Sequence, residues 1–287
     1  MTDPVRGKTA FVFAGGGSFG AIQVGMLRAL VAHGVQPDFV VGASVGAINC
    51  AYFAGDPTPA GVARLERIWC ELRRRDVFAV TWGQIRSLFS HPPSLVSAAG
   101  LRQLIERHLP YHLLEEAKIP VHVIATEQLH GNSIRLSSGP AIDAILASCA
   151  IPAVYPSVLI GNDYLIDGAI ANNTPIKAAV ELGASRLIVL PTGYACALAA
   201  PPASAIGNAL HALNMLIAHQ LVQDLELLAG KVQVLTVPPL CPLAVSAYDF
   251  SRASELIERA AHNTQRWLDH DGLTQFRIPG ALRPHVD

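Results

Sequence analysis

Residues 9–46 read TAFVFAGGGSFGAIQVGMLRALVAHGVQPDFVVGASVG, and this stretch decides the fold. Its apolar runs at residues 9–14 and 39–41 predict two strands, and the segments that follow them, residues 21–33 and 45–54, predict two helices. Neither strand alternates polar with apolar residues, so we expect both faces of each strand to be buried. Buried runs of this kind are typical of a parallel sheet that is covered on both sides.

The same alternation continues through the rest of the chain. Further strands are expected at residues 120–126, 164–166, 187–190 and 232–237, and further helices at residues 141–150, 176–182 and 205–229. This order predicts an α/β fold with a mostly parallel central sheet covered by helices on both faces. We expect a single domain over residues 1–287, with the motifs in residues 8–195, a helical insertion or cap at about residues 55–118, and a C-terminal strand and helices in residues 205–287.

The composition limits the classes of function. Hydrophobic residues make up 51% of the chain and charged residues only 15%, which excludes a disordered chain. The net charge of −1 gives no footprint for nucleic acid. Apolar stretches are interrupted before the roughly 20 residues of a membrane span, and residues 1–9 lack the apolar core of a signal peptide. We therefore expect a cytoplasmic protein.

Residues 15–20, GGGSFG, join the first strand to the first helix and match the G-x-G-x-x-G fingerprint. Glycines at such a turn let backbone N–H groups approach a negative charge at a helix N-terminus. That charge is a pyrophosphate in a dinucleotide-binding oxidoreductase and a reacting oxyanion in an acyl hydrolase. A dinucleotide site also needs an acidic residue at the end of the second strand, whereas Asp38 precedes that strand. The loop alone leaves both classes open.

Ser44 lies in the pentapeptide from Gly42 to Gly46, GASVG, which matches the nucleophile elbow G-x-S-x-G between a strand and a helix. The elbow is a strained turn that exposes the serine hydroxyl. A glycine-rich turn in which Ser44 only caps the helix is the alternative. One strand precedes this elbow where an ordinary α/β-hydrolase has several. No later histidine follows a clear strand end, so no histidine is singled out as the base.

A third motif, Asp167-Gly168-Ala169, follows the strand expected at residues 164–166. The carboxyl ends of parallel strands meet at one edge of a sheet, so we expect Asp167, Ser44 and the glycine loop to lie at the same edge. An isolated Asp-Gly pair indicates only a turn. The three motifs together favour a hydrolytic site.

The chain resembles the patatin-like phospholipase family in these three motifs, in their order, and in the segments ASCAIP at residues 147–152 and NNTP at residues 172–175. The resemblance covers residues 8–195. It implies a patatin-like three-layer sandwich and a lipid acyl hydrolase, acting on phospholipids or lysophospholipids, with a Ser–Asp dyad and no metal or cofactor. Ser44 would be the nucleophile and Asp167 its general base. The oxyanion hole would be formed by the backbone amides of the first motif, namely Gly15, Gly16, Gly17, Ser18, Phe19 and Gly20.

Phe19 departs from the family pattern, which has Arg or Lys before the last glycine of the first motif. The departure raises the question of how the loop is held, and it keeps a catalytically dead lipid-binding relative open as an alternative. A carboxylate base also has to be desolvated if its pKa is to rise. We therefore expect an apolar acyl-chain pocket beside Asp167.

A lipid hydrolase meets its substrate at an interface, so peripheral contact with a membrane is expected. Apolar residues of the 55–118 insertion are candidates for a lid, although their helical spacing favours a position in the core. They are Phe78, Trp82, Ile85, Leu88 and Phe89. The sequence does not indicate an oligomeric state.

Overall fold

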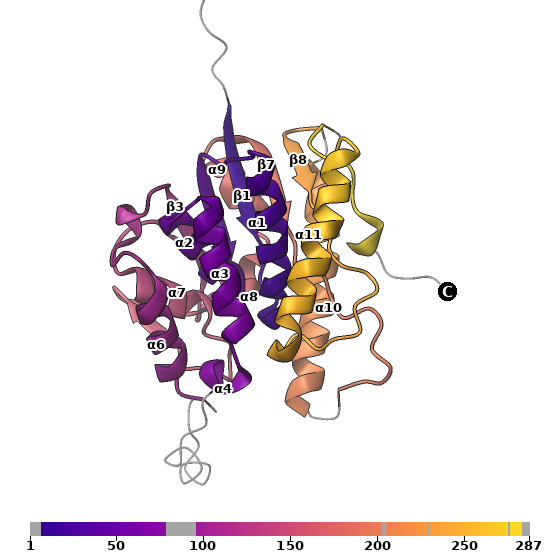
Figure 1. Cartoon of the computed structure of the whole chain (residues 1–287). Coiled ribbons are helices and arrows are strands. Elements are labelled where there is room, and N and C mark those ends of the chain that lie inside the picture. Colours follow the sequence, from indigo (N-terminus) through magenta and orange to yellow (C-terminus); the bar gives the residue numbers. More distant parts are fainter. Residues whose placement is uncertain (1–6, 79–95, 203–204, 229, 275, 283–287) are drawn as a thin grey trace, which may run out of the picture.

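A computed structural model describes residues 7–78, 96–202, 205–228, 230–274 and 276–282 of the chain (Figure 1). The strands are β1 (Lys8–Phe13), β2 (Phe39–Ala43), β3 (Val121–Glu127), β4 (Ser133–Leu136), β5 (Val158–Ile160), β6 (Asp163–Asp167), β7 (Ala184–Leu190) and β8 (Gln233–Thr236). They form one eight-stranded sheet in the order β5-β6-β3-β2-β1-β7-β8, in which β4 also pairs with β3.

The larger part of the sheet is parallel, which confirms the expectation. β3, β2, β1, β7 and β8 are neighbours in parallel register, whereas β4, β5 and β6 are joined by antiparallel pairs. The central strand β1 shows why its run is apolar throughout. Its Phe11 and Phe13 pack into one hydrophobic cluster, and its Ala10 and Val12 pack into another on the opposite face.

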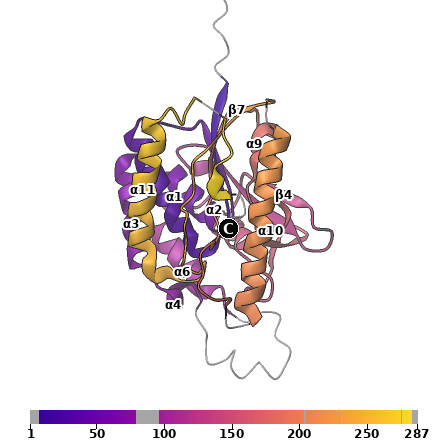
Figure 2. The same cartoon turned by 90° about the vertical axis from the view of Figure 1, so that its right-hand side faces the viewer.

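Helices cover both faces of the sheet, so the predicted three-layer α/β fold is confirmed (Figure 2). One face carries α1 (Gly20–Ala32), α2 (Val45–Gly55), α3 (Pro59–Glu71) and α11 (Ala253–Asp269), and the other carries α9 (Ile176–Glu181) and α10 (Ala205–Leu228). The long helices α10 and α11 lie on opposite sides of the strands (Figure 2). Among the described helices, none combines the length and apolar character that crossing a membrane requires.

Helix α3 shows how the region after α2 is built. Thr58 precedes the helix and its side chain accepts a hydrogen bond of 3.1 Å from the amide of Gly61, while Pro59 occupies the first turn. The buried face of α3, with Leu65 and Trp69, packs against α1 and α2. Two more helices follow, α4 (Arg74–Val77) and α6 (Ala99–His108). In the described part of residues 55–118 there is no strand.

The strands β4 and β5 were not predicted from the sequence. Both strands are short and lie at one side of the sheet, and the residues of β4 are exposed or half-buried. Leu159, at the centre of β5, is 56% exposed. An exposed edge strand does not need the continuous apolar run that marked the central strands, so its sequence resembles a loop.

Candidate active site

Two strands meet end to end along one edge of β3. β2 pairs with residues 121–124 of β3 and β6 pairs with residues 125–127, while β4 pairs with residues 123–126. Because β4 occupies one edge of β3 over this overlap, β2 and β6 share the other edge. β2 is parallel to β3 and β6 is antiparallel to it, so the two strands run toward each other. Ser44, which follows β2, and Asp167, which ends β6, are thereby brought together.

The direction of β6 differs from the one that the sequence predicted. We expected Asp167 at the carboxyl edge of a parallel strand, but β6 is antiparallel to β3. Asp167 pairs with Ala125 of β3, one residue beyond the partner of the last residue of β2, Ala43. The aspartate therefore reaches Ser44 from the opposite direction, and not because the carboxyl ends of parallel strands coincide.

The hydroxyl of Ser44 donates a hydrogen bond of 2.8 Å to Oδ2 of Asp167. Ser44 has a φ of 53° and occupies the N-cap position of α2 without a side-chain cap bond, so the helix-cap alternative is wrong. A positive φ in a residue other than glycine stores roughly 1–3 kcal/mol of strain. The amide of Ser44 donates to Oγ of Ser148 at 2.9 Å, and Oγ of Ser148 in turn donates to the carbonyl of Ile124 at 2.5 Å. These bonds hold the strained turn.

Glycines leave room for this turn. A Cβ on Gly46 would lie 2.4 Å from the carbonyl oxygen of Phe13, and a Cβ on Gly42 would lie 2.4 Å from the carbonyl oxygen of Gly46. Both contacts are with backbone, which cannot yield as a flexible side chain would. The G-x-S-x-G spacing thus has a steric cause in this fold.

Asp167 is 3% exposed and is held by short hydrogen bonds. Its Oδ1 accepts from the amide of Ala169 at 2.8 Å, and its carbonyl accepts from Oγ1 of Thr126 at 2.8 Å. Burial raises the pKa of Asp167 to about 6, against the lowering effect of its bonds from Ala169 and Ser44. The expected desolvated carboxylate is therefore present beside Ser44.

Four of the six amides in the glycine loop already donate within the fold. Gly15 donates to the carbonyl of Asn173, Ser18 to Ala247, Phe19 to Gly16, and Gly20 to Gly17 and Ser18. Among the described residues, the amides of Gly16 and Gly17 donate to no group. Both glycines have positive φ values, 154° and 61°, and both line a hollow together with Ser44 and Asp167. Of the six amides that the sequence suggested for an oxyanion hole, these two are the ones without a hydrogen-bond partner among the described residues.

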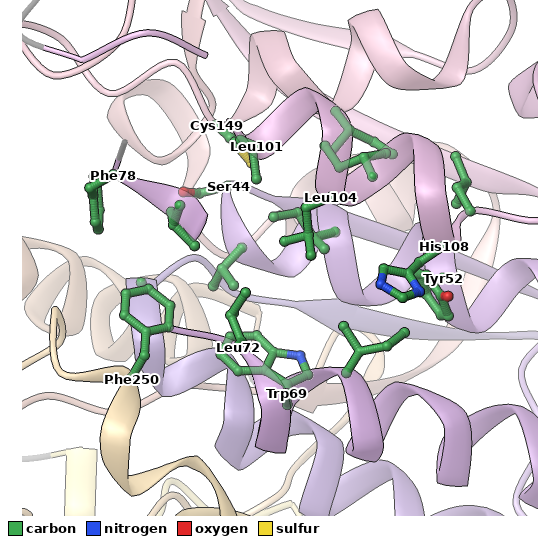
Figure 3. Close-up of a pocket in the computed structure, with 18 of the residues that line it drawn as sticks. Ser44, Tyr52, Trp69, Leu72, Phe78, Leu101, Leu104, His108, Cys149 and Phe250 are labelled. Atoms are coloured by element: carbon green, nitrogen blue, oxygen red, sulfur yellow. The ribbon is translucent and has the colours of Figure 1, made fainter. Parts of the chain in front are cut away.

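An apolar pocket extends from Ser44 between α2, α3 and α6 (Figure 3). In the view of Figure 3, Trp69, Leu72 and Leu104 lie between Ser44 and His108, and Phe78 and Phe250 lie on the other side of Ser44. Phe78 lines the pocket and its ring contacts those of Tyr155, Tyr248 and Phe250. The other four candidates for a lid, Trp82, Ile85, Leu88 and Phe89, lie outside the described residues.

Several residues of the site were not predicted. Ser148 supports Ser44, and it lies in the ASCAIP segment, whose contribution the sequence did not reveal. Ser18 bonds to the segment between β8 and α11, through the carbonyls of Ser246 and Ala247. Tyr248 of that segment lines the pocket beside Ser44. No local motif marks these loop residues, so only the three-dimensional contact reveals them.

The dinucleotide alternative lacks its acidic residue in this fold. Oδ2 of Asp38 accepts a hydrogen bond of 2.6 Å from the amide of Thr9, at the beginning of β1. The glycine loop follows the other end of β1, so Asp38 lies at the opposite edge of the sheet. In the described part of the chain, no three His, Cys, Asp or Glu side chains gather as a metal site would require.

Comparison with known proteins gives a family match. Residues 11–180 match the family model described as Patatin-like phospholipase. A patatin-like phospholipase domain-containing protein of Caenorhabditis elegans is 30% identical over 189 residues, which cover 63% of this chain and 16% of that protein. Patatin-like phospholipase domain-containing protein 7 of Rattus norvegicus is 28% identical over 187 residues, covering 64% of this chain and 13% of that protein.

A structure of human cytosolic phospholipase A2 in complex with methyl gamma-linolenyl fluorophosphonate is also similar. Its sequence identity is 14% and its TM-score is 0.49, with 96% of this chain and 59% of that chain covered. The chain therefore spans only 13–16% of the length of the two curated relatives and about three fifths of this structure.

Proposed function

The chain belongs to the patatin-like phospholipase family, and on that premise we propose that it is a serine hydrolase that cleaves the acyl esters of lipids, with phospholipids or lysophospholipids as substrates. The observation that carries the proposal is the 2.8 Å hydrogen bond from Ser44, which lines an apolar pocket, to the buried Asp167. A nucleophile, a base and a place for an acyl chain lie together there.

Asp167 is the general base in this mechanism. Its carboxylate takes the proton of Ser44 as the serine oxygen attacks the ester carbonyl, and the proton then passes to the departing alcohol. Water, deprotonated by Asp167, attacks the acyl-enzyme, and Asp167 returns the proton to the Ser44 oxygen as the acid leaves. A pKa of about 6 makes Asp167 a stronger base than an exposed aspartate and leaves it mostly ionised at neutral pH.

The amides of Gly16 and Gly17 form the oxyanion hole. They are the loop amides without a partner among the described residues, and both glycines line the same hollow as Ser44. A preorganised donor of this kind contributes about 3 kcal/mol to transition-state stabilisation. The reaction as proposed uses no metal.

The pocket receives the acyl chain. Its wall is apolar from Ser44 to Leu104, as an alkyl chain requires, and each buried methylene contributes about 0.8 kcal/mol to binding. His108 at the far end has a pKa lowered by burial, so it presents a neutral ring to the chain. The headgroup stays at the mouth of the pocket, which is consistent with peripheral contact at a lipid surface.

Mass spectrometry of the products from mixed phospholipids and lysophospholipids tests the proposal. We expect release of free fatty acid by the wild type, unchanged by EDTA, and none by Ser44→Ala. Flotation with liposomes of the same lipids tests the membrane contact. Absence of hydrolysis together with retained liposome binding would favour the dead lipid-binding relative, and a melting shift with a nicotinamide dinucleotide would favour the oxidoreductase.

A further inference from the structure

Phe19 stands in the glycine loop at the position where the family pattern has Arg or Lys. The side chain is fully buried and belongs to the main hydrophobic cluster, so it makes no polar contact with the loop. The family pattern has a cation at this position. A loop that must present two amides to an oxyanion still has to be fixed to a fraction of an ångström. Because Phe19 has no polar group, another residue of this chain has to hold the glycine loop.

Three buried polar side chains form a chain of hydrogen bonds directly behind the loop. They are Gln23 of α1, Asn49 of α2 and Trp69 of α3, with exposures of 0%, 0% and 4%. The indole N–H of Trp69 donates to Oδ1 of Asn49 at 2.9 Å. Nδ2 of Asn49 donates to Oε1 of Gln23 at 2.8 Å. Every link is uncharged, and all three residues come from different helices.

This chain of side chains holds both ends of the loop. Nε2 of Gln23 donates to the carbonyl of Ala14 at 2.8 Å, at the residue before Gly15, and to the carbonyl of Leu190 at 2.9 Å. Nδ2 of Asn49 donates to the carbonyl of Gly20 at 2.9 Å, at the end of the loop. The two amides without a partner, those of Gly16 and Gly17, lie between these fixed points.

The third member connects this network to the pocket. Trp69 lines the apolar pocket that extends from Ser44, and its N–H points away to Asn49. An acyl chain lying along the indole ring therefore contacts a residue that is hydrogen-bonded to the holder of the loop. Trp69 therefore takes part both in the pocket wall and in the network that holds the glycine loop.

We propose that Gln23 and Asn49 are positioning residues that hold the glycine loop through uncharged hydrogen bonds, where the family pattern has a cation. Trp69 fixes these two side chains against the pocket that receives the acyl chain. This inference rests on the proposed function. It predicts that loss of the network slows the chemical step, whereas a network that only joins helices would affect stability alone.

The test compares kcat, KM and the melting temperature of Gln23→Met and Asn49→Leu with those of the wild type, on soluble acetate and octanoate esters. We expect kcat to fall about 10- to 100-fold on both esters, with KM changed less than about threefold, because the loop amides move relative to the reacting carbon. The second-order rate of labelling by a fluorophosphonate should fall in parallel.

Tyr111→Phe is the matched control. The hydroxyl of Tyr111 donates to the carbonyl of Ala51 in the same helix as Asn49, at 2.8 Å, and it contacts neither the loop nor the pocket. This variant also loses one buried hydrogen bond, so it should lower the melting temperature while kcat stays within about twofold.

Trp69→Phe keeps the test decisive if the apolar variants do not fold. It keeps a smaller aromatic ring in the pocket wall and removes the N–H, and acetate, which does not fill the pocket, is insensitive to the lost ring volume. We therefore expect a smaller fall in kcat on acetate, about 3- to 10-fold, caused by loss of the hydrogen bond to Asn49. A kcat within twofold of wild type in folded Gln23→Met, Asn49→Leu or Trp69→Phe would overturn this inference alone. A wild type that neither hydrolyses esters nor reacts with the fluorophosphonate would overturn the proposed function and this inference with it.

Discussion

The parallel and antiparallel parts of the sheet differ in how they are built, and each supplies one half of the site. In the parallel part, strands such as β1 and β2 are buried on both faces, and the glycine loop follows β1 while Ser44 follows β2. In the antiparallel part, β5 and β6 are short and partly exposed, and Asp167 ends β6. The serine and its partner meet where the two parts share an edge of β3. The function proposed here depends on that junction rather than on either part alone.

The largest effect is expected from breaking the pair across the junction. Ser44→Ala and Asp167→Asn should each lower kcat/KM about 10⁴-fold or more, because each removes one partner of the same proton transfer. The double variant should be no slower than the slower single one. Rates of ester hydrolysis at substrate concentrations well below KM measure kcat/KM, and additive losses would show that the two residues do not act as a unit.

A Leu→Ala substitution should have different effects on stability in the parallel and antiparallel parts of the sheet. Leu187→Ala in β7 removes a side chain that is 0% exposed and should lower the free energy of unfolding by about 2–5 kcal/mol. Leu159→Ala in β5, where the side chain is 56% exposed, should change it by less than about 0.5 kcal/mol. Urea unfolding at pH 7 measures both, and equal losses would contradict the distinction.

The pKa of Asp167 links activity to stability. Its value of about 6 in the folded chain exceeds the roughly 3.9 of an unfolded aspartate, so the folded state binds more protons between these values. Stability therefore decreases as pH rises through this window, by up to about 3 kcal/mol. Asp167→Asn removes the free-energy cost of burying an ionised carboxylate. This variant should therefore be more stable than wild type at pH 7 and nearly equal to it in stability at pH 3.5.

The same pKa sets the pH profile. Ionised Asp167 is the base, so kcat/KM should rise with pH and reach half of its plateau near pH 6. A profile that stays flat from pH 5 to 8, or a decrease in stability for Asp167→Asn at pH 7, would show that burial does not control this carboxylate.

A smaller effect is expected from loosening the turn at the junction. Ser148→Ala leaves the buried amide of Ser44 without its partner, which should lower the free energy of unfolding by about 1–3 kcal/mol and kcat about 10-fold. Ser133→Ala in the exposed strand β4 is the control and should change neither quantity. Stability loss without any change in kcat would limit Ser148 to a structural role.

The sequence predicted the parallel part of the fold well because burial on both faces imposes apolar runs, as in β1 and β7. It also placed Ser44, Asp167 and the glycine loop together, since three motifs with defined spacing carried that information. It did not predict the direction of β6, because a strand of five residues has the same pattern whichever way it pairs.

The support of the site was harder to foresee. Ser148, Gln23 and Asn49 act through hydrogen bonds to residues 9 to 167 positions away in the chain. Neither hydrophobic periodicity nor a local motif predicts hydrogen bonds between residues so far apart in the sequence. Which loop amides stay free for an oxyanion likewise depends on carbonyls from distant segments, such as that of Ala247.

Peptide mapping after reaction with a fluorophosphonate tests whether Ser44 is the nucleophile activated by Asp167. We expect one adduct in wild type, on the peptide that contains Ser44. We expect no adduct in Ser44→Ala and strongly slowed labelling in Asp167→Asn with the fold intact. An adduct on another residue, no adduct on the folded wild type, or labelling of Asp167→Asn at the wild-type rate would contradict these roles of Ser44 and Asp167.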